Sequence, residues 1–275
     1  MTTVSAITGT LRVDDARLHY EVRGSGPLVA FVGAPMDAQA FEPLADLLAT
    51  DHTVLTTDPR GIHRSPLDDP RQDSTPPLRA GDLARLIAHV DAGPAVALGS
   101  SGGACTVLAL AQAHPERARA VIAHEPPLAE LLDDREELRK GTDDMIATYL
   151  DGDVIGAWGK FMAQADINLP EGALEQMFGG ERDPQQVTDE RRWFEHELLE
   201  TTFWRPDIAA LRAGGTHVVA AIGEDSAGEI CDRATRALAG ALGIEPTLFP
   251  GGHIGFADDP AGFAVRLREV LAEVP

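Results

Sequence analysis

The most constraining feature of this 275-residue sequence is a regular alternation of short apolar runs and amphipathic segments. Runs such as 27–33 (PLVAFVG) and 93–100 (GPAVALGS) are almost wholly apolar, which is typical of strands buried on both faces of a sheet. Segments such as 40–50 and 78–90 follow these runs and carry apolar residues at helical spacing. The alternation predicts an α/β fold, with parallel strands joined by right-handed crossovers.

The same pattern continues along both ends of the chain. A strand with its exit turn is expected at 52–61. Further strands are expected at 118–127, 216–225 and 245–252, and further helices at 103–116, 229–242 and 261–274. Residues 9–13 and 16–24 instead alternate apolar and polar side chains around Asp14 and Asp15. That alternation predicts a hairpin at one edge of the sheet.

A long helical block interrupts the alternation. From Leu128 to Arg205 the spacing is helical only, and the block is rich in tryptophan, phenylalanine and methionine. We therefore expect one α/β core, formed by 1–127 and 206–275. Residues 128–205 are expected to form a helical cap, or lid, because the linkers around them are short.

Composition excludes several classes of protein. The net charge is -21, and a surface this acidic repels nucleic acids and anionic membranes. Cys105 and Cys231 make neither a disulfide framework nor a metal-binding spacing. The first residues lack the pattern of a signal peptide, and no apolar run reaches the roughly 18 residues of a membrane span. We expect a cytoplasmic protein that acts on a small molecule, and we leave open a homodimer.

The segment Gly99-Ser100-Ser101-Gly102-Gly103 lies between an expected strand and an expected helix. Only Ser101 has glycine at both the second residue before it and the second residue after it. A nucleophile on a sharp strand-to-helix turn needs small residues at those two positions. The helix N-terminus then directs unpaired N–H groups to the place where an oxyanion would form. Ser101 is therefore the candidate nucleophile.

With this turn, the chain resembles the α/β-hydrolase superfamily, and the resemblance covers nearly all of it. Residues 56–66 (TTDPRGIHRSP) are similar to the superfamily's segment D-x-R-G-x-G-x-S, with His63 in place of the second glycine. Residues 31–41 (FVGAPMDAQAF) are similar to the segment that normally reads H-G-x-P, with Val32 in place of the histidine. That histidine is mostly structural in the superfamily, so its replacement does not argue against activity.

The resemblance implies an α/β-hydrolase fold with a mostly parallel central sheet, flanking helices and an inserted helical cap. It also implies that the backbone N–H groups of Ala34 and Gly102 form the oxyanion hole. Residues 251–256 (GGHIGF) are similar to the superfamily's catalytic histidine loop, which points to His253 as the base.

The other eight histidines are weaker candidates for the base. Surface positions are expected for His19, His52, His89 and His114, a strand start for His217, and positions near the pocket mouth for His63, His124 and His196. Only His253 lies in a glycine-rich loop that leaves the last strand, at the sheet edge where Ser101 is expected.

The acid that orients this histidine has two candidates. The superfamily usually places it three residues after the glycine that ends 217–223, but that position holds Ser226, with Asp225 just before it. The other position used in the superfamily is the end of the strand that follows the nucleophile helix, where this chain has Glu125. A carboxylate on an apolar strand end needs a partner, and His253 would supply one. We favour Glu125 and keep Asp225 as the alternative.

A serine rather than an aspartate at position 101 argues against the dehalogenase and epoxide-hydrolase branches. It fits hydrolysis of an ester, lactone or thioester through an acyl-enzyme, with no metal or organic cofactor. Some aromatic residues of the cap should line the pocket, with residues 191–206 as one wall, and this favours a bulky apolar substrate. A lyase or cyclase on the same residues and a non-catalytic binding protein are the alternatives.

Overall fold

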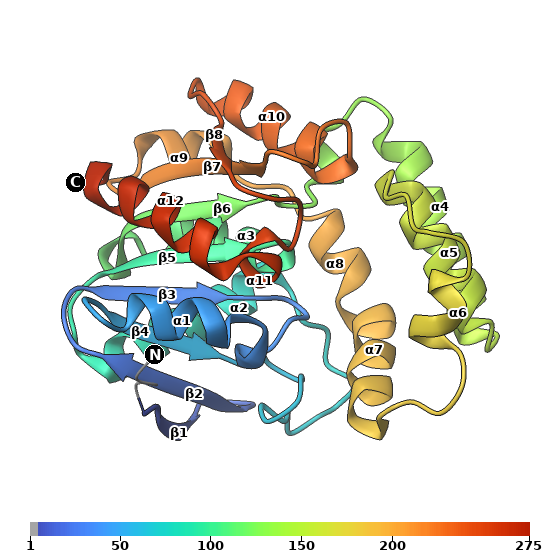
Figure 1. Cartoon of the computed structure of the whole chain (residues 1–275), viewed down its shortest axis with the longest axis horizontal. Coiled ribbons are helices and arrows are strands. Elements are labelled where there is room, and N and C mark those ends of the chain that lie inside the picture. The colour runs from blue at the N-terminus through green and yellow to red at the C-terminus, as the bar shows by residue number, and fades with distance from the viewer. Residues whose placement is uncertain (1–4) are drawn as a thin grey trace.

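The computed structural model describes residues 5–275, and within them eight strands form one sheet (Figure 1). The strands are β1 (Ile7–Arg12), β2 (Arg17–Gly24), β3 (Leu28–Val32), β4 (Thr53–Thr57), β5 (Ala95–Ser100), β6 (Ala118–His124), β7 (His217–Gly223) and β8 (Thr247–Phe249). Their order across the sheet is β1-β2-β4-β3-β5-β6-β7-β8. The hairpin β1–β2 and the pair β2–β4 are antiparallel, and all other pairs are parallel. The predicted mostly parallel sheet and its edge hairpin are confirmed.

Helices cover both faces of the sheet. One face carries the 3-10 turn η1 (Ala38–Phe41) with α1 (Glu42–Leu48), α11 (Gly255–Asp258) and α12 (Pro260–Glu273). The other face carries α2 (Pro76–Val90), α3 (Gly102–Ala113), α9 (Ile208–Ala213) and α10 (Ile230–Leu242), with η2 (Pro115–Arg117) after α3. Every residue of β3, β4 and β5 is buried, which explains why β3 and most of β5 are apolar on both faces, while β4 buries three threonines.

Between β6 and α9 the chain is helical. This stretch holds η3 (Ala129–Leu131), α4 (Arg135–Leu150), α5 (Val154–Ala165), α6 (Ala173–Phe178), α7 (Pro184–His196) and α8 (Leu198–Thr202). Figure 1 shows α4 to α7 standing away from the sheet, beyond the ends to which the parallel strands point. Because all these strands end on that side, the loops after β5 and β6 lie at the edge of the sheet that faces these helices.

Most aromatic side chains of this stretch pack on each other. Tyr149 stacks on Phe194 with 4.1 Å between ring centroids, and Trp158 stacks on Trp193 at 5.3 Å. The buried Glu190 accepts hydrogen bonds from the Tyr149 hydroxyl (3.0 Å) and from Trp158 Nε1 (2.7 Å). The stretch thus has a small apolar core of its own, fixed by one buried carboxylate.

The ends of several elements differ from the expected ranges, and two of these differences have a clear local cause. The last strand ends at Phe249 rather than reaching 252, because Pro250 and the left-handed Gly251 (φ 82°) turn the chain. The helix expected from residue 78 begins at Pro76, after the N-cap Thr75.

Among the residues that the structure describes, no helix combines the length and the apolar character that crossing a membrane requires.

Candidate active site

Ser101 occupies a sharp turn between β5 and α3. Its φ is 55° and its ψ is -124°, a backbone conformation that residues other than glycine rarely adopt. Its backbone N–H donates to His124 O (3.0 Å), and its carbonyl accepts from Ala104 N (2.9 Å). These two bonds on either side of the residue fix the strained turn, and they leave the Ser101 side chain half-exposed in a cavity.

The flanking glycines are required by the close passage of backbone atoms. A Cβ atom on Gly99 would lie 2.1 Å from Gly103 O, and one on Gly103 would lie 2.0 Å from Val32 O. No side chain fits at either position without displacing the main chain. The need for small residues around Ser101, expected from the sequence, therefore has a direct steric cause in the packing of β3, β5 and α3.

Glu125 and His253 form a short hydrogen bond next to this turn. Glu125 follows β6 with φ 53° and is fully buried, and His253 lies in the loop between β8 and α11. His253 Nδ1 donates to Glu125 Oε2 (2.6 Å), and Gly223 N donates to Glu125 Oε1 (2.8 Å). Both carboxylate oxygens are thus satisfied, and the contact with Nδ1 leaves the Nε2 atom of the ring available as a base.

The electrostatics of the pair favour its charged form. Burial opposes ionisation of Glu125, but hydrogen bonding to His253 outweighs it and lowers the pKa of Glu125. For His253, burial favours the neutral ring, but Cys231 and Glu125 outweigh burial and raise its pKa well above 6.5.

Ser101 and His253 line the same cavity but are not hydrogen-bonded. Within residues 5–275, no hydrogen bond joins the Ser101 hydroxyl to the His253 ring. Such contacts are often long in enzymes without substrate. The structure therefore brings Ser101 and His253 to one cavity and joins His253 to Glu125.

Ala34 and Gly102 lie together beside Ser101. A Cβ atom on Gly102 would lie 2.6 Å from Ala34 O and 3.1 Å from Ala34 Cβ. In the described part of the chain neither N–H donates a hydrogen bond, although Ala34 is almost fully buried. Gly102 is the first residue of α3, where unpaired N–H groups and the helix dipole favour negative charge. Both residues line the cavity that contains Ser101.

The cavity holds about 760 Å³ of empty space, part of it open to solvent. Its wall combines the turn at Ser101 with side chains of the helical stretch, namely Met145, Phe161, Ile167, Trp193 and Leu198. Most of this wall is apolar, and Gln164 Nε2 already donates to Thr142 Oγ1 (2.8 Å). Of the segment 191–206 expected to form a wall, four residues reach the cavity, namely Trp193, Leu198, Thr201 and Thr202.

The alternative acid is not paired with the histidine. Asp225 is exposed, and its side chain makes no hydrogen bond or ion pair within residues 5–275. Ser226 is fully buried beside Gly252 of the histidine loop, and its Oγ atom has no hydrogen-bond partner in the described chain. The position that usually carries the acid is thus close to His253, but it holds a hydroxyl.

Two expectations about other histidines are wrong. His19, expected at the surface, is buried on β2 and lies 3.2 Å from Glu21. His124, expected near the pocket mouth, is fully buried under the turn at Ser101, and burial lowers its pKa to about 4. The period-2 alternation of β2 does not reveal that its outer face is covered, and the last residue of β6 points into the core.

Among the polar residues of the cavity wall, Glu229 and Cys231 were not predicted from the sequence. Glu229 is half-buried just before α10, and burial together with the nearby Glu125 raises its pKa. Cys231 is buried on the first turn of α10, and burial raises the pKa of its thiol. The loop after β7, at the carboxyl edge of the sheet, was the signal that could have found them.

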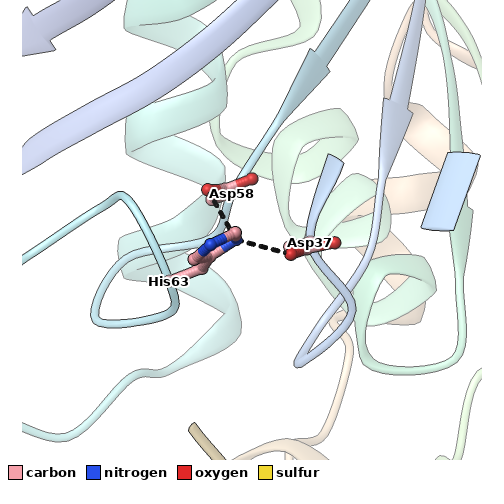
Figure 2. Close-up of side chains that lie close together, drawn as sticks. All are labelled: Asp37, Asp58 and His63. Carbon is pink, nitrogen blue, oxygen red and sulfur yellow. Dashed lines mark hydrogen bonds and ion pairs between the residues drawn. The ribbon is translucent and has the colours of Figure 1, made fainter. Parts of the chain in front are cut away.

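One side-chain cluster near this site has the composition of a metal site. The ligand atoms of Asp37, Asp58 and His63 lie within 4.8 Å of one another (Figure 2). Asp58 is fully buried, but Arg64 donates to both of its oxygens, from Nε to Oδ2 (2.7 Å) and from its terminal nitrogen to Oδ1 (2.9 Å). The guanidinium already neutralises this carboxylate, so the donor set does not fit an additional cation.

Comparison with known proteins gives the same fold. A family model described as the alpha/beta hydrolase fold matches residues 26–154. YraK, an uncharacterised hydrolase of Bacillus subtilis, is 32% identical over 274 residues, which cover 96% of this chain and 95% of YraK. Among solved structures, Est816, an N-acyl homoserine lactone degrading enzyme, is similar with a TM-score of 0.69 at 16% identity, covering 95% of this chain and 99% of Est816.

A thermophilic esterase from Thermogutta terrifontis is similar with a TM-score of 0.67 at 20% identity, covering 98% of this chain and 99% of the esterase. At these identities the two solved structures support the fold, whereas YraK is related over almost the whole chain. The protein is thus a hydrolase of the α/β-hydrolase type, and it belongs to the α/β-hydrolase family.

Proposed function

We propose that this protein is a serine hydrolase that cleaves an ester, lactone or thioester through an acyl-enzyme on Ser101. The observation that carries the proposal is the 2.6 Å contact between His253 Nδ1 and the buried Glu125, in a cavity that His253 shares with Ser101. A serine hydroxyl is a weak nucleophile unless a base lies within reach, and a base needs a partner that orients it. The cavity that His253 shares with Ser101 supports the first requirement, and the contact of His253 with Glu125 supports the second.

The proposed reaction begins when Ser101 Oγ attacks the substrate carbonyl carbon and its proton passes to His253 Nε2. The N–H groups of Ala34 and Gly102 stabilise the negative oxygen of the tetrahedral intermediate. The bond from carbon to the leaving oxygen or sulfur then breaks, and His253 returns the proton to that atom. Water repeats the attack on the acyl-enzyme and releases the carboxylic acid. Glu125 keeps the imidazole oriented and stabilises its charged form throughout.

The substrate is proposed to be bulky and apolar. The wall opposite Ser101 is built from apolar side chains such as Met145, Phe161 and Trp193, and it offers few unpaired polar groups. A cavity of this kind stabilises an apolar acyl group or lactone ring by burying it. We further propose that 128–205 act as a cap over the nucleophile, supported by their contribution to the same cavity.

A fluorophosphonate is the probe that tests this function. Because it reacts with activated serines, we expect intact-mass spectrometry to find one added group, and peptide mapping to locate it on Ser101. Aryl esters, lactones and acyl thioesters would then be assayed for turnover. Folded protein that takes up no probe would contradict the proposal and would favour a binding protein. Labelled protein that cleaves substrates without adding water, or that cyclises them, would favour a lyase or cyclase.

The acidic limb of the pH profile is expected at an elevated pH. Only neutral His253 accepts the serine proton, and Cys231 and Glu125 raise the pKa of His253 above 6.5 in spite of burial. We therefore expect kcat/KM to fall as pH decreases through a midpoint above 6.5, and Glu125→Gln to move this midpoint down. The measurement is kcat/KM against pH, with circular dichroism to show that the fold persists. A midpoint of 6.5 or lower in the unaltered protein would contradict this assignment.

The remaining expectations stay predictions. They are a cytoplasmic location, a homodimer as one candidate oligomeric state, and a reaction that uses no cofactor.

A further inference from the structure

His63 has a backbone conformation that its residue type disfavours. It lies in the loop after β4, and its φ is 47°. In the left-handed region a residue with a Cβ is strained, and glycine is not. Strain of this kind persists where surrounding contacts hold it, and it is concentrated near functional sites.

The contacts of His63 join three separate parts of the molecule. Its Nδ1 atom donates to Asp37 Oδ2 (2.7 Å) and lies 3.7 Å from Asp58 Oδ2 at the end of β4 (Figure 2). Its backbone N–H donates to Asp189 Oδ1 (3.0 Å) on α7. One residue therefore connects the loop after β3, the end of β4 and the inserted helices.

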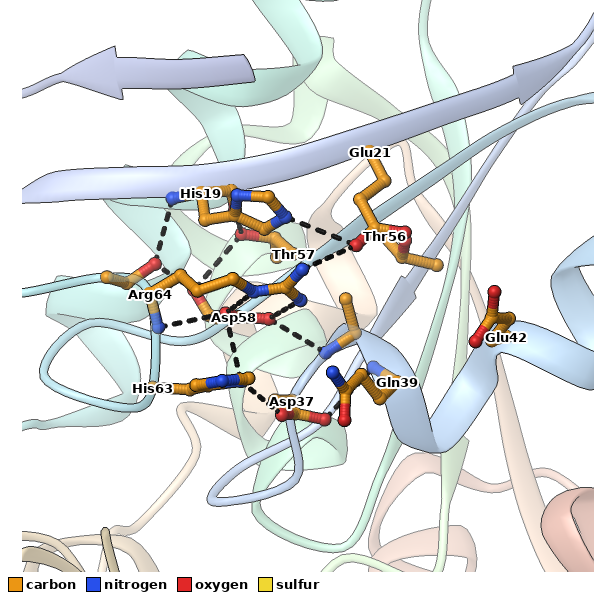
Figure 3. A network of polar contacts seen from close by, with 12 residues as sticks. His19, Glu21, Asp37, Gln39, Glu42, Thr56, Thr57, Asp58, His63 and Arg64 are labelled. Carbon is orange, nitrogen blue, oxygen red and sulfur yellow. Dashed lines mark hydrogen bonds and ion pairs between the residues drawn. The ribbon is translucent and has the colours of Figure 1, made fainter. Parts of the chain in front are cut away.

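The loop after β3 carries Ala34, and Asp37 is its anchor. Asp37 lies three residues beyond Ala34, and its Oδ1 atom accepts from Gln39 N (2.9 Å) (Figure 3). The backbone N–H of Ala38, the residue after Asp37, donates to Asp58 Oδ1 (3.0 Å). The carboxylate of Asp37 thus organises this loop with one oxygen, while His63 fixes the other oxygen.

We propose that His63 is a positioning residue that holds the loop carrying the Ala34 N–H through Asp37. The role rests on the proposed function, because it matters only if that N–H binds the oxyanion on Ser101. Donors to an oxyanion act through accurate placement, so a loop that loses one anchor loses transition-state stabilisation before it loses substrate binding. A glycine at this position would relieve the strain, but it would have no side chain to reach Asp37.

The test is His63→Gly, which relieves the strain and removes the imidazole in one change. We expect kcat to fall about tenfold, a fraction of what losing a whole oxyanion donor costs, with a smaller change in KM. We expect the midpoint of thermal unfolding to stay the same or rise, because glycine accepts this φ. A purely structural role of His63 would not produce this combination.

Three further variants sharpen the test. His63→Asn should recover most of kcat, because asparagine tolerates positive φ and its Nδ2 atom takes the place of Nδ1. Asp37→Asn should lower kcat as His63→Gly does. The double variant should lower kcat no further, because each single change already removes the same contact between residues 63 and 37. Asp91→Gly is the matched control, because Asp91 has φ 53° at the exposed end of α2, and its kcat should stay unchanged.

Each outcome decides the proposal. It is overturned if His63→Gly keeps the kcat of the unaltered protein, or if KM rises while kcat stays constant. If His63→Gly does not fold, an unchanged kcat in Asp37→Asn overturns it equally. Failure of fluorophosphonate to label Ser101 in the unaltered protein removes the proposed function together with this role. A labelled protein with no effect of either variant removes the role alone.

Discussion

Ser101→Ala is expected to lower kcat by about 10⁴- to 10⁶-fold and to abolish labelling by fluorophosphonate, while the fold stays intact. The change removes the attacking oxygen and leaves nothing in its place. The turn itself should survive, because it is fixed by the backbone bonds to His124 and Ala104 and by the flanking glycines, none of which involves the hydroxyl. Steady-state kinetics and thermal unfolding check both halves of this expectation.

The neighbouring serine provides the control. Ser100 is fully buried at the end of β5, with its Oγ atom 3.3 Å from His124 Nδ1, and it does not line the cavity. Ser100→Ala should therefore remain active and be labelled on Ser101. An active Ser101→Ala protein, or a probe found on Ser100, would show that the nucleophile has been assigned to the wrong residue.

Glu125→Gln is expected to lower kcat by about 10⁴-fold, as loss of a triad carboxylate does. The amide can still accept the hydrogen bond from Gly223 N, so the change is small for the fold. It removes the negative charge that stabilises the imidazolium, and it no longer fixes which ring nitrogen carries the proton. Steady-state kinetics of Glu125→Gln beside Asp225→Asn checks the assignment, and Asp225→Asn should be close to the unaltered protein.

A double variant tests the geometry behind this prediction. Ser226 is buried beside the histidine loop with an unpaired Oγ atom, at the position where the superfamily usually has the acid. Glu125→Gln combined with Ser226→Asp should recover part of the lost kcat, because it returns a carboxylate beside the loop that carries His253. If Asp225→Asn abolishes turnover and Glu125→Gln does not, the acid is Asp225.

Much of the fold could be predicted from the sequence because it depends on local patterns. Runs such as 27–33 are apolar at every position, and this occurs only where both faces of a strand are covered. The turn at Ser101 was visible because its serine and both flanking glycines lie within five residues of chain, although the requirement for glycine at 103 comes from the close approach of Val32 on β3. The boundary of β8 was less visible, since Pro250 and Gly251 end a strand that the apolar pattern would continue.

Contacts between distant residues were beyond the reach of these patterns. Glu125 and Asp225 both follow parallel strands, so both were placed at the same edge of the sheet, and only the tertiary structure brings Glu125 within 2.6 Å of His253. The aromatic residues of 128–205 all follow a helical spacing in the sequence. In the structure, however, Phe161 and Trp193 reach the cavity, while Phe194 packs on Tyr149. Spacing defines a helix face, but the neighbouring helices decide what that face meets.

By itself, then, the sequence determined the alternating α/β architecture, the helical insertion and the glycine-flanked turn at Ser101, because backbone sterics and apolar periodicity act over short stretches of chain. Only the tertiary structure decided which carboxylate meets His253, which side chains line the cavity, and that His63 reaches Asp37 and Asp189. Those contacts join residues up to 128 positions apart, and their formation depends on how whole elements pack.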